Sequence, residues 1–100
     1  MKLGILVNTD RHLDHIVGIT NVALARGHEV IIFAMGSGTR LLGTPEFSAL
    51  CGAPGVSMSF CDYIAKRLHV PTESLLPEIV CGSQYHNAAM NHDADRVIVL

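Results

Sequence analysis

The chain has 100 residues, enough for one domain with a hydrophobic core, and we expect a single domain over residues 1–100. Hydrophobic residues make up 49% of the chain and charged residues only 16%, so an oligomer is expected to cover part of the apolar surface. The formal net charge of −2 and the few aromatic residues argue against nucleic acid as a partner.

The N-terminal sequence MKLGILVNTD leads directly into a strand-like run and does not have the pattern of a signal peptide. No apolar segment reaches the length that crosses a membrane, so no membrane partner is expected. The three cysteines are an odd number. We therefore expect a cytoplasmic, reducing compartment, in which cysteines are more often catalytic or redox-active than structural.

The first third of the sequence predicts a strand and a helix. Lys2–Asn8 is a nearly continuous aliphatic run, as in a strand buried on both faces, and Thr9–Asp10 could cap the following helix. Arg26–Gly27 is expected to end that helix, and Gly18 within it is expected to allow close contact with the sheet or a neighbouring subunit. The residues that form one face of the predicted helix recur at helical spacing: Leu13, Ile16, Ile19, Thr20, Ala23 and Leu24.

Two more strands are predicted in the middle of the chain. His28–Met35 is a second buried strand, which a turn at Gly36–Gly38 and a short irregular helix at Thr44–Leu50 follow. Val56–Phe60 is a third strand, and it places Cys61 at its end.

The last third continues the alternation of strands and helices. Asp62–Leu68 has helical spacing, and Leu75–Val80 is expected to be a brief strand or an extended segment that Pro77 interrupts. Gly82–Ser83 opens a helix that continues to about Asn91, and Arg96–Leu100 is a last strand.

This alternation predicts an α/β fold, a flavodoxin-like three-layer sandwich with a four- or five-stranded parallel sheet. In the flavodoxin-like strand order 2-1-3-4-5, the first and third strands are neighbours at the topological switch point, where sites form. Cys61 would then lie close to Asn8, Thr9, Asp10 and His12.

Cys61 is the main candidate for chemistry. A cysteine between a strand and a helix lies near the free N–H groups of the first helical turn, which favour a thiolate. Asp62 follows directly, and its carboxylate would disfavour the thiolate unless it points away from the sulfur.

The segments LGILVNTD, ALARGHEVIIFAMGSGTRLL, VSMSFCDYIAKRLHV and DADRVIVL together resemble the DsrE/DsrF-like family of small sulfur-relay proteins, which includes the TusD-type carriers. The resemblance covers essentially the whole chain, and the placement of the cysteine is its sharpest feature. It implies a flavodoxin-like fold, homo- or hetero-oligomers such as trimers or hexamers, and sulfur carried as a persulfide. Only Cys61 corresponds to the sulfur acceptor of the family.

The arguments for a functional role of the other two cysteines are weaker. Cys81 follows an apolar run and precedes Gly82–Ser83, so it could be a resolving thiol or a second relay position, or an ordinary buried cysteine. Cys51 falls at a helix end, where exposed carbonyl groups raise the pKa of a thiol, and we expect a structural role. No pair has the C-x-x-C spacing of a thioredoxin-like motif.

The six histidines do not form a recognised metal motif, and no metal or cofactor is expected. His12 and His15 are three residues apart on the first helix, and His86 and His92 are placed on the last. Either His12 or His15 could assist Cys61 as a proton acceptor or a cationic neighbour.

Three functions remain open from the sequence. The leading one is a sulfurtransferase-like carrier in which Cys61 takes sulfur from a donor protein and passes it to the cysteine of an acceptor protein. The second is a non-catalytic module that assembles into oligomers or binds a small ligand. The third is a redox sensor that forms a disulfide between Cys61 and Cys81 or between subunits.

Overall fold

The computed structural model describes all 100 residues and has a five-stranded sheet in which every neighbouring pair is parallel. The α/β architecture with a five-stranded parallel sheet is therefore confirmed. The strands are β1 (Lys2–Val7), β2 (Glu29–Ala34), β3 (Val56–Cys61), β4 (Ile79–Gly82) and β5 (Arg96–Val99).

The predicted strand order is wrong, because the observed order is β4-β3-β2-β1-β5. Strand β2 lies between β1 and β3, with Ile32 paired to Ile5 on one side and to Met58 on the other. The chain adds β2, β3 and β4 in one direction and then returns to place β5 on the far side of β1. The switch point is therefore between β1 and β5, away from Cys61.

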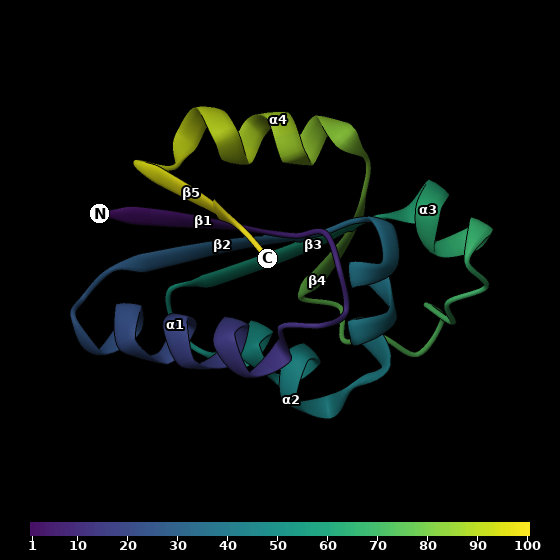
Figure 1. Ribbon diagram of the computed structural model, residues 1–100, viewed down its shortest axis with the longest axis horizontal. Coiled ribbons are helices and arrows are strands. Elements are labelled where there is room, and N and C mark those ends of the chain that lie inside the picture. The colour runs from purple at the N-terminus through teal and green to yellow at the C-terminus, as the bar shows by residue number, and fades with distance from the viewer.

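The helices lie on the two faces of the sheet and at one end of it (Figure 1). Helices α1 (Leu13–Ala25) and α2 (Pro45–Ser48) cover one face, and α4 (Gln84–Asp93) lies alone on the other. Helix α3 (Asp62–Arg67) lies beyond the end of the sheet where β3 ends. Two 3₁₀ segments, η1 (Gly36–Gly43) and η2 (Ala49–Gly52), complete the structure.

Helix α1 differs from its prediction at two places. The N-cap is His12, which makes no capping hydrogen bond with its side chain, so the prediction of Thr9–Asp10 as the cap is wrong. A Cβ at Gly18 would have no atom within 4 Å, so the predicted close contact with the sheet is also wrong. The buried face of α1 is formed by Ile16, Thr20 and Ala23, and Gly18 lies on the exposed side. Contact of Gly18 with a neighbouring subunit stays a prediction.

Other boundaries follow the sequence more closely. The predicted end of α1 is confirmed, with Arg26 as C-cap and Gly27 at a φ of 81°. The turn predicted at Gly36–Gly38 is instead the start of the eight-residue segment η1. A Cβ at Gly38 would lie 2.2 Å from the Val7 carbonyl oxygen, so only glycine allows this approach. The segment Leu75–Val80 was expected to be a brief strand or an extended segment. In the structure the fourth strand begins only at Ile79, after Pro77.

The hydrophobic core has two parts because successive residues of a strand point to opposite faces of the sheet. The larger cluster lies on the side of α1 and α2, and includes Ile5, Val30, Ile32, Met58 and Phe60. The smaller cluster lies on the α4 side and consists of Phe33, Cys61 and Met90, with several partly buried side chains around it. None of the helices has the length and apolar character that crossing a membrane requires.

Candidate thiol site

Cys61 is the last residue of β3 and the N-cap of α3, so the predicted strand-to-helix junction is confirmed. Its backbone is extended, with φ −83° and ψ 106°, and its side chain makes no capping hydrogen bond. Helix α3 has only six residues and ends before the predicted Leu68.

The Cys61 side chain is buried on the α4 face of the sheet. It is 4% exposed and packs in the cluster with Phe33 and Met90. Because side chains alternate along a strand, Cys61 lies on the same face as Ser57 and Ser59 of β3. A reagent would therefore reach the sulfur from that face or by displacing the residues around it.

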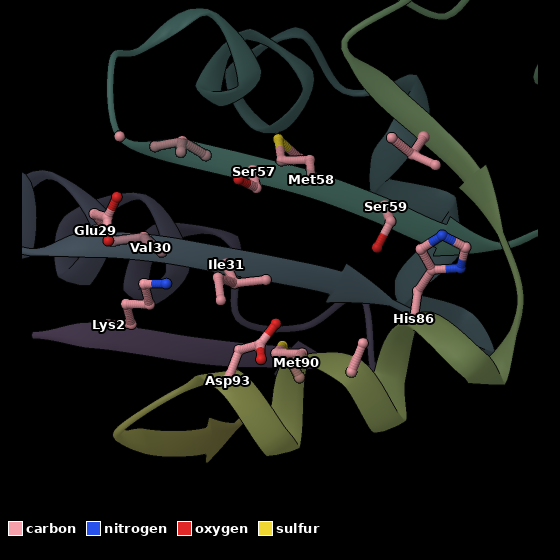
Figure 2. Close-up of a pocket in the computed structure, with 14 residues that line it drawn as sticks. Lys2, Glu29, Val30, Ile31, Ser57, Met58, Ser59, His86, Met90 and Asp93 are labelled. Atoms are coloured by element: carbon pink, nitrogen blue, oxygen red, sulfur yellow. The ribbon is translucent and has the colours of Figure 1, made fainter.

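A groove of about 450 Å³ runs along this same face, between α4 and the strands β2 to β4 (Figure 2). Ser57, Ser59 and Val80 line its sheet side, and His86, Met90 and Asp93 of α4 line the opposite side. Met90 lines the groove and lies over Gly4 of β1, which is level with Ile31 and Ser57. Cys61 is four residues farther along β3 than Ser57 and is not among the residues that line the groove.

His86 occupies the end of the groove near β4, a placement that the sequence analysis missed. Its Nδ1 accepts a hydrogen bond from the Ser83 N–H at 3.2 Å, while Ser83 Oγ accepts one from the Tyr85 N–H, which completes a capping box at the start of α4. A Cβ at Gly82 would lie 2.5 Å from His86 Nδ1, so the imidazole fills the space that glycine leaves.

This arrangement places the imidazole close to Cys61. Gly82 is the register partner of Cys61, and the two point to the same face of the sheet. Since Nδ1 accepts a hydrogen bond, the ring proton lies on Nε2, which faces β3 in Figure 2. The sequence signal was Gly82–Ser83 followed by a histidine at the third position of the helix.

The Asp62 carboxylate forms an ion pair with Lys66 of α3, with Nζ 2.8 Å from Oδ2. The thiol of Cys81 is the other side chain that favours the ionised form of Asp62. The hydrogen bond from Lys66 is the main reason that the pKa of Asp62 is lowered, with a smaller contribution from Cys81. The sequence left open whether the Asp62 carboxylate points to the Cys61 sulfur or to the helix. Its ion pair with Lys66 shows that it points to helix α3.

Cys81 is exposed, so its interpretation as an ordinary buried cysteine is wrong, and its strand does lie next to β3. Partial desolvation is the largest cause that raises the pKa of the Cys81 thiol, and the hydrogen bond to Asp62 and the charge of Asp62 add to it. The Lys66 charge acts in the opposite direction. The exposed thiol is therefore stabilised in its protonated form.

Cys61 and Cys81 point to opposite faces of the sheet, although their strands are neighbours. Cys81 is paired in register with Phe60, and Cys61 with Gly82. Side chains that point apart cannot form a disulfide without movement of the backbone. The structure thus does not favour the disulfide between Cys61 and Cys81 that the sequence left open.

Cys51 is buried in the larger core cluster. The pKa of its thiol is raised, as expected, but burial is the main cause and the nearby Glu78 charge adds to it. The exposed carbonyl groups of a helix end, which the sequence analysis invoked, are not among the causes that raise it.

The predicted auxiliary residues Asp10, His12 and His15 are exposed and are not brought together with Cys61. Helix α1 packs on the opposite face of the sheet from Cys61, and β2 separates β1 from β3. The rings of His12 and His15 instead contact each other edge-on, with centroids 6.0 Å apart. No group of three or more His, Cys, Asp or Glu residues lies close enough together to hold a metal ion.

No protein-family model matches the sequence, and no curated protein matches it either. The structure is similar to the crystal structure of the ychN protein from E. coli, with a TM-score of 0.72. The similarity covers 99% of this chain and 97% of that chain, at 13% sequence identity. The two chains therefore share a fold over almost their whole length, and at this identity the similarity shows the fold alone.

Proposed function

We propose that the protein is a sulfur-relay subunit that carries sulfur as a persulfide on Cys61 and passes it to a partner cysteine. The observation that carries this proposal is the position of Cys61, at the end of β3 and at the N-cap of α3, in a fold shared with the ychN protein. This is where the sequence resemblance puts the sulfur acceptor.

The reaction is an exchange at sulfur. The Cys61 thiolate attacks the outer sulfur of a donor persulfide, the donor S–S bond breaks, and the donor leaves as a thiol. The Cys61 persulfide then gives its outer sulfur to an acceptor cysteine by the same exchange. Because Cys61 is 4% exposed, each step requires that the side chains covering it move aside.

The proposed partners are sulfur donor and acceptor proteins, together with other subunits of the same or a related chain in a trimer or hexamer. Several large apolar side chains on the outer surface support assembly, among them Val22, Tyr85 and Val99, which are 57%, 74% and 62% exposed. A relay through free thiols also requires a reducing compartment, for which the cytoplasm is our proposal.

The test is the intact mass of the wild type, Cys61→Ser and Cys81→Ser after incubation with a persulfide donor. We expect the wild type and Cys81→Ser to gain one sulfur atom that a reductant removes, and Cys61→Ser to gain none. Sulfur gained by Cys61→Ser and lost in Cys81→Ser would move the carrier role to Cys81. No gain in any protein would remove the main support for the proposal.

The groove gives a specific reason to retain a second function, the binding of a small ligand without sulfur transfer. Its volume falls in the range of small-molecule sites, and it combines apolar side chains with Ser57, Ser59 and His86. In that case Cys61 would be a packing residue. It would then resist alkylation in the native protein and gain no sulfur while a ligand still binds.

A further inference from the structure

Cys61 has one neighbour on each side in the sheet, and both neighbours lie on the α4 face. On the β4 side the neighbour is Gly82, its register partner. On the β2 side it is Met35, because the preceding register pair joins Ala34 to Phe60. The Met35 backbone is extended, with φ −142° and ψ 174°, and its N–H still donates to a carbonyl oxygen of β1. Neighbouring strands lie about 4.8 Å apart, so Met35 is directly beside Cys61.

A hydrogen bond joins these two sides across β3. Helix α4 begins at the end of the sheet where α3 lies (Figure 1). Gln84 is its first residue, only two residues after Gly82, and Gln84 Nε2 donates to Met35 Sδ at 3.9 Å. Strand β3 lies between β4 and β2, so a contact from the β4 side to the end of β2 passes over the end of β3. The residue at that end is Cys61, and its exposure of only 4% agrees with a cover at this position.

The cover is at the protein surface and is held by one weak hydrogen bond. Gln84 is exposed and Met35 is half-buried, whereas the cluster beneath them is buried. The other side-chain hydrogen bond of Gln84 lies within α4, from Asn87 Nδ2 to Gln84 Oε1 at 3.1 Å. A thioether is a weak acceptor, and an unbranched Met side chain adapts readily to new packing. The two side chains can therefore separate without unfolding of the sheet.

We infer that Gln84 and Met35 form a movable cover that controls access to the Cys61 sulfur. When the pair separates, the thiol becomes accessible at the carboxyl end of the sheet and not through the groove, whose lining does not include Cys61. This inference rests on the proposed function for its role, which is to admit a donor or acceptor cysteine. Gln84 and Met35 take no part in the sulfur exchange itself.

The test is the rate at which iodoacetamide alkylates each cysteine of the native protein, followed by the masses of the three cysteine peptides. Gln84→Glu removes the donor to Met35 but keeps the size of the side chain and the oxygen that accepts from Asn87. A carboxylate is also favourable at the start of a helix. Met35→Leu removes the sulfur acceptor and keeps an apolar side chain of similar volume. The matched control is Asn21→Asp, the same change of amide to carboxylate at an exposed position of α1.

We expect Cys61 to be alkylated about fivefold faster in Gln84→Glu and in Met35→Leu, which corresponds to the loss of one hydrogen bond from the closed state. The double variant should gain no more than either single variant, because both substitutions remove the same bond. The Cys51 rate should stay unchanged, since Cys51 is buried in the other core cluster and reports opening of the core. Asn21→Asp should match the wild type at every cysteine. An added carboxylate disfavours a nearby thiolate, so charge alone would slow the reaction and does not account for a faster one.

An unchanged Cys61 rate in either single variant would overturn the cover and leave the carrier function standing. An equal rise at Cys61 and Cys51 would also overturn it, because the substitutions would then have loosened the whole core. Faster alkylation of Cys61 alone, in a protein that gains sulfur from no donor, would support the cover and overturn the carrier function.

Discussion

Replacing Gly82 with alanine tests the placement of His86 beside Cys61. The added Cβ would lie 2.5 Å from His86 Nδ1, and ordinary contact begins at 3.4 Å, so the ring must move by roughly 1 Å. That movement breaks the hydrogen bond from the Ser83 N–H to Nδ1, which belongs to the capping box of α4. Gly82 has no positive φ, so alanine fits its backbone conformation.

The magnitude follows from two opposing effects. Loss of a capping interaction costs about 0.5–2 kcal/mol, whereas alanine in place of glycine within a strand contributes about 0.5–1 kcal/mol to stability. With the strain of a displaced ring included, we expect Gly82→Ala to lower the free energy of unfolding by about 1 kcal/mol. In a His86→Ala background the clash is absent, so the same substitution should raise the free energy of unfolding by about 0.5 kcal/mol.

The assay is a double-mutant cycle measured by urea unfolding of the wild type, the two single variants and the double variant. The expected result is a change of sign for Gly82→Ala between the two backgrounds, with a coupling of about 1.5 kcal/mol. Equal effects of Gly82→Ala in both backgrounds would refute the contact, and with it the placement of the imidazole next to Cys61.

Three further substitutions test other parts of the structure. Asp62→Asn removes the carboxylate that keeps the Cys81 thiol protonated, so alkylation of Cys81 should rise at lower pH than in the wild type, and an unchanged pH profile would contradict that contact. Gly18→Ala should stabilise the monomer by about 0.5–1 kcal/mol, because the site is open and helical, and a loss of assembly instead would show that a neighbouring subunit packs there. Gly38→Ala should destabilise by about 2 kcal/mol or more, because its Cβ would meet the rigid backbone of Val7, and a neutral result in thermal unfolding would contradict the packing of η1 on β1.

Much of the secondary structure could be predicted because it depends on local patterns. The aliphatic run at Lys2–Val7, the helical spacing after Leu13 and the change of period at Cys61 each act within a few residues. The start of α4 was also predictable, since Ser83 is a typical N-cap.

The strand order could not be predicted in this way. Strands β1 and β2 carry apolar runs, and β3 alternates apolar residues with serines. Neither pattern specifies which strand lies beside which. The position of β2 between β1 and β3 is set by packing over the whole sheet, and this is why Asp10 and His12 do not meet Cys61.

The surroundings of Cys61 also depended on the fold. Its thiol is buried in the cluster that contains Phe33, which comes from β2, far from Cys61 in the sequence. His86 can lie against Gly82 because glycine has no side chain to fill that space. Neither the side chains that bury the thiol nor the position of His86 can be predicted from the sequence around Cys61.

The central claim is that Cys61 carries sulfur, and the most direct measurement is the position of the added sulfur. Wild-type protein would be loaded with a persulfide donor without reductant, digested, and its three cysteine peptides compared by mass spectrometry. The account predicts one additional sulfur atom on the Cys61 peptide, removable by a reductant, and none on the peptides of Cys51 and Cys81. Sulfur on Cys81 alone, or on no cysteine while all three remain reduced, would contradict it.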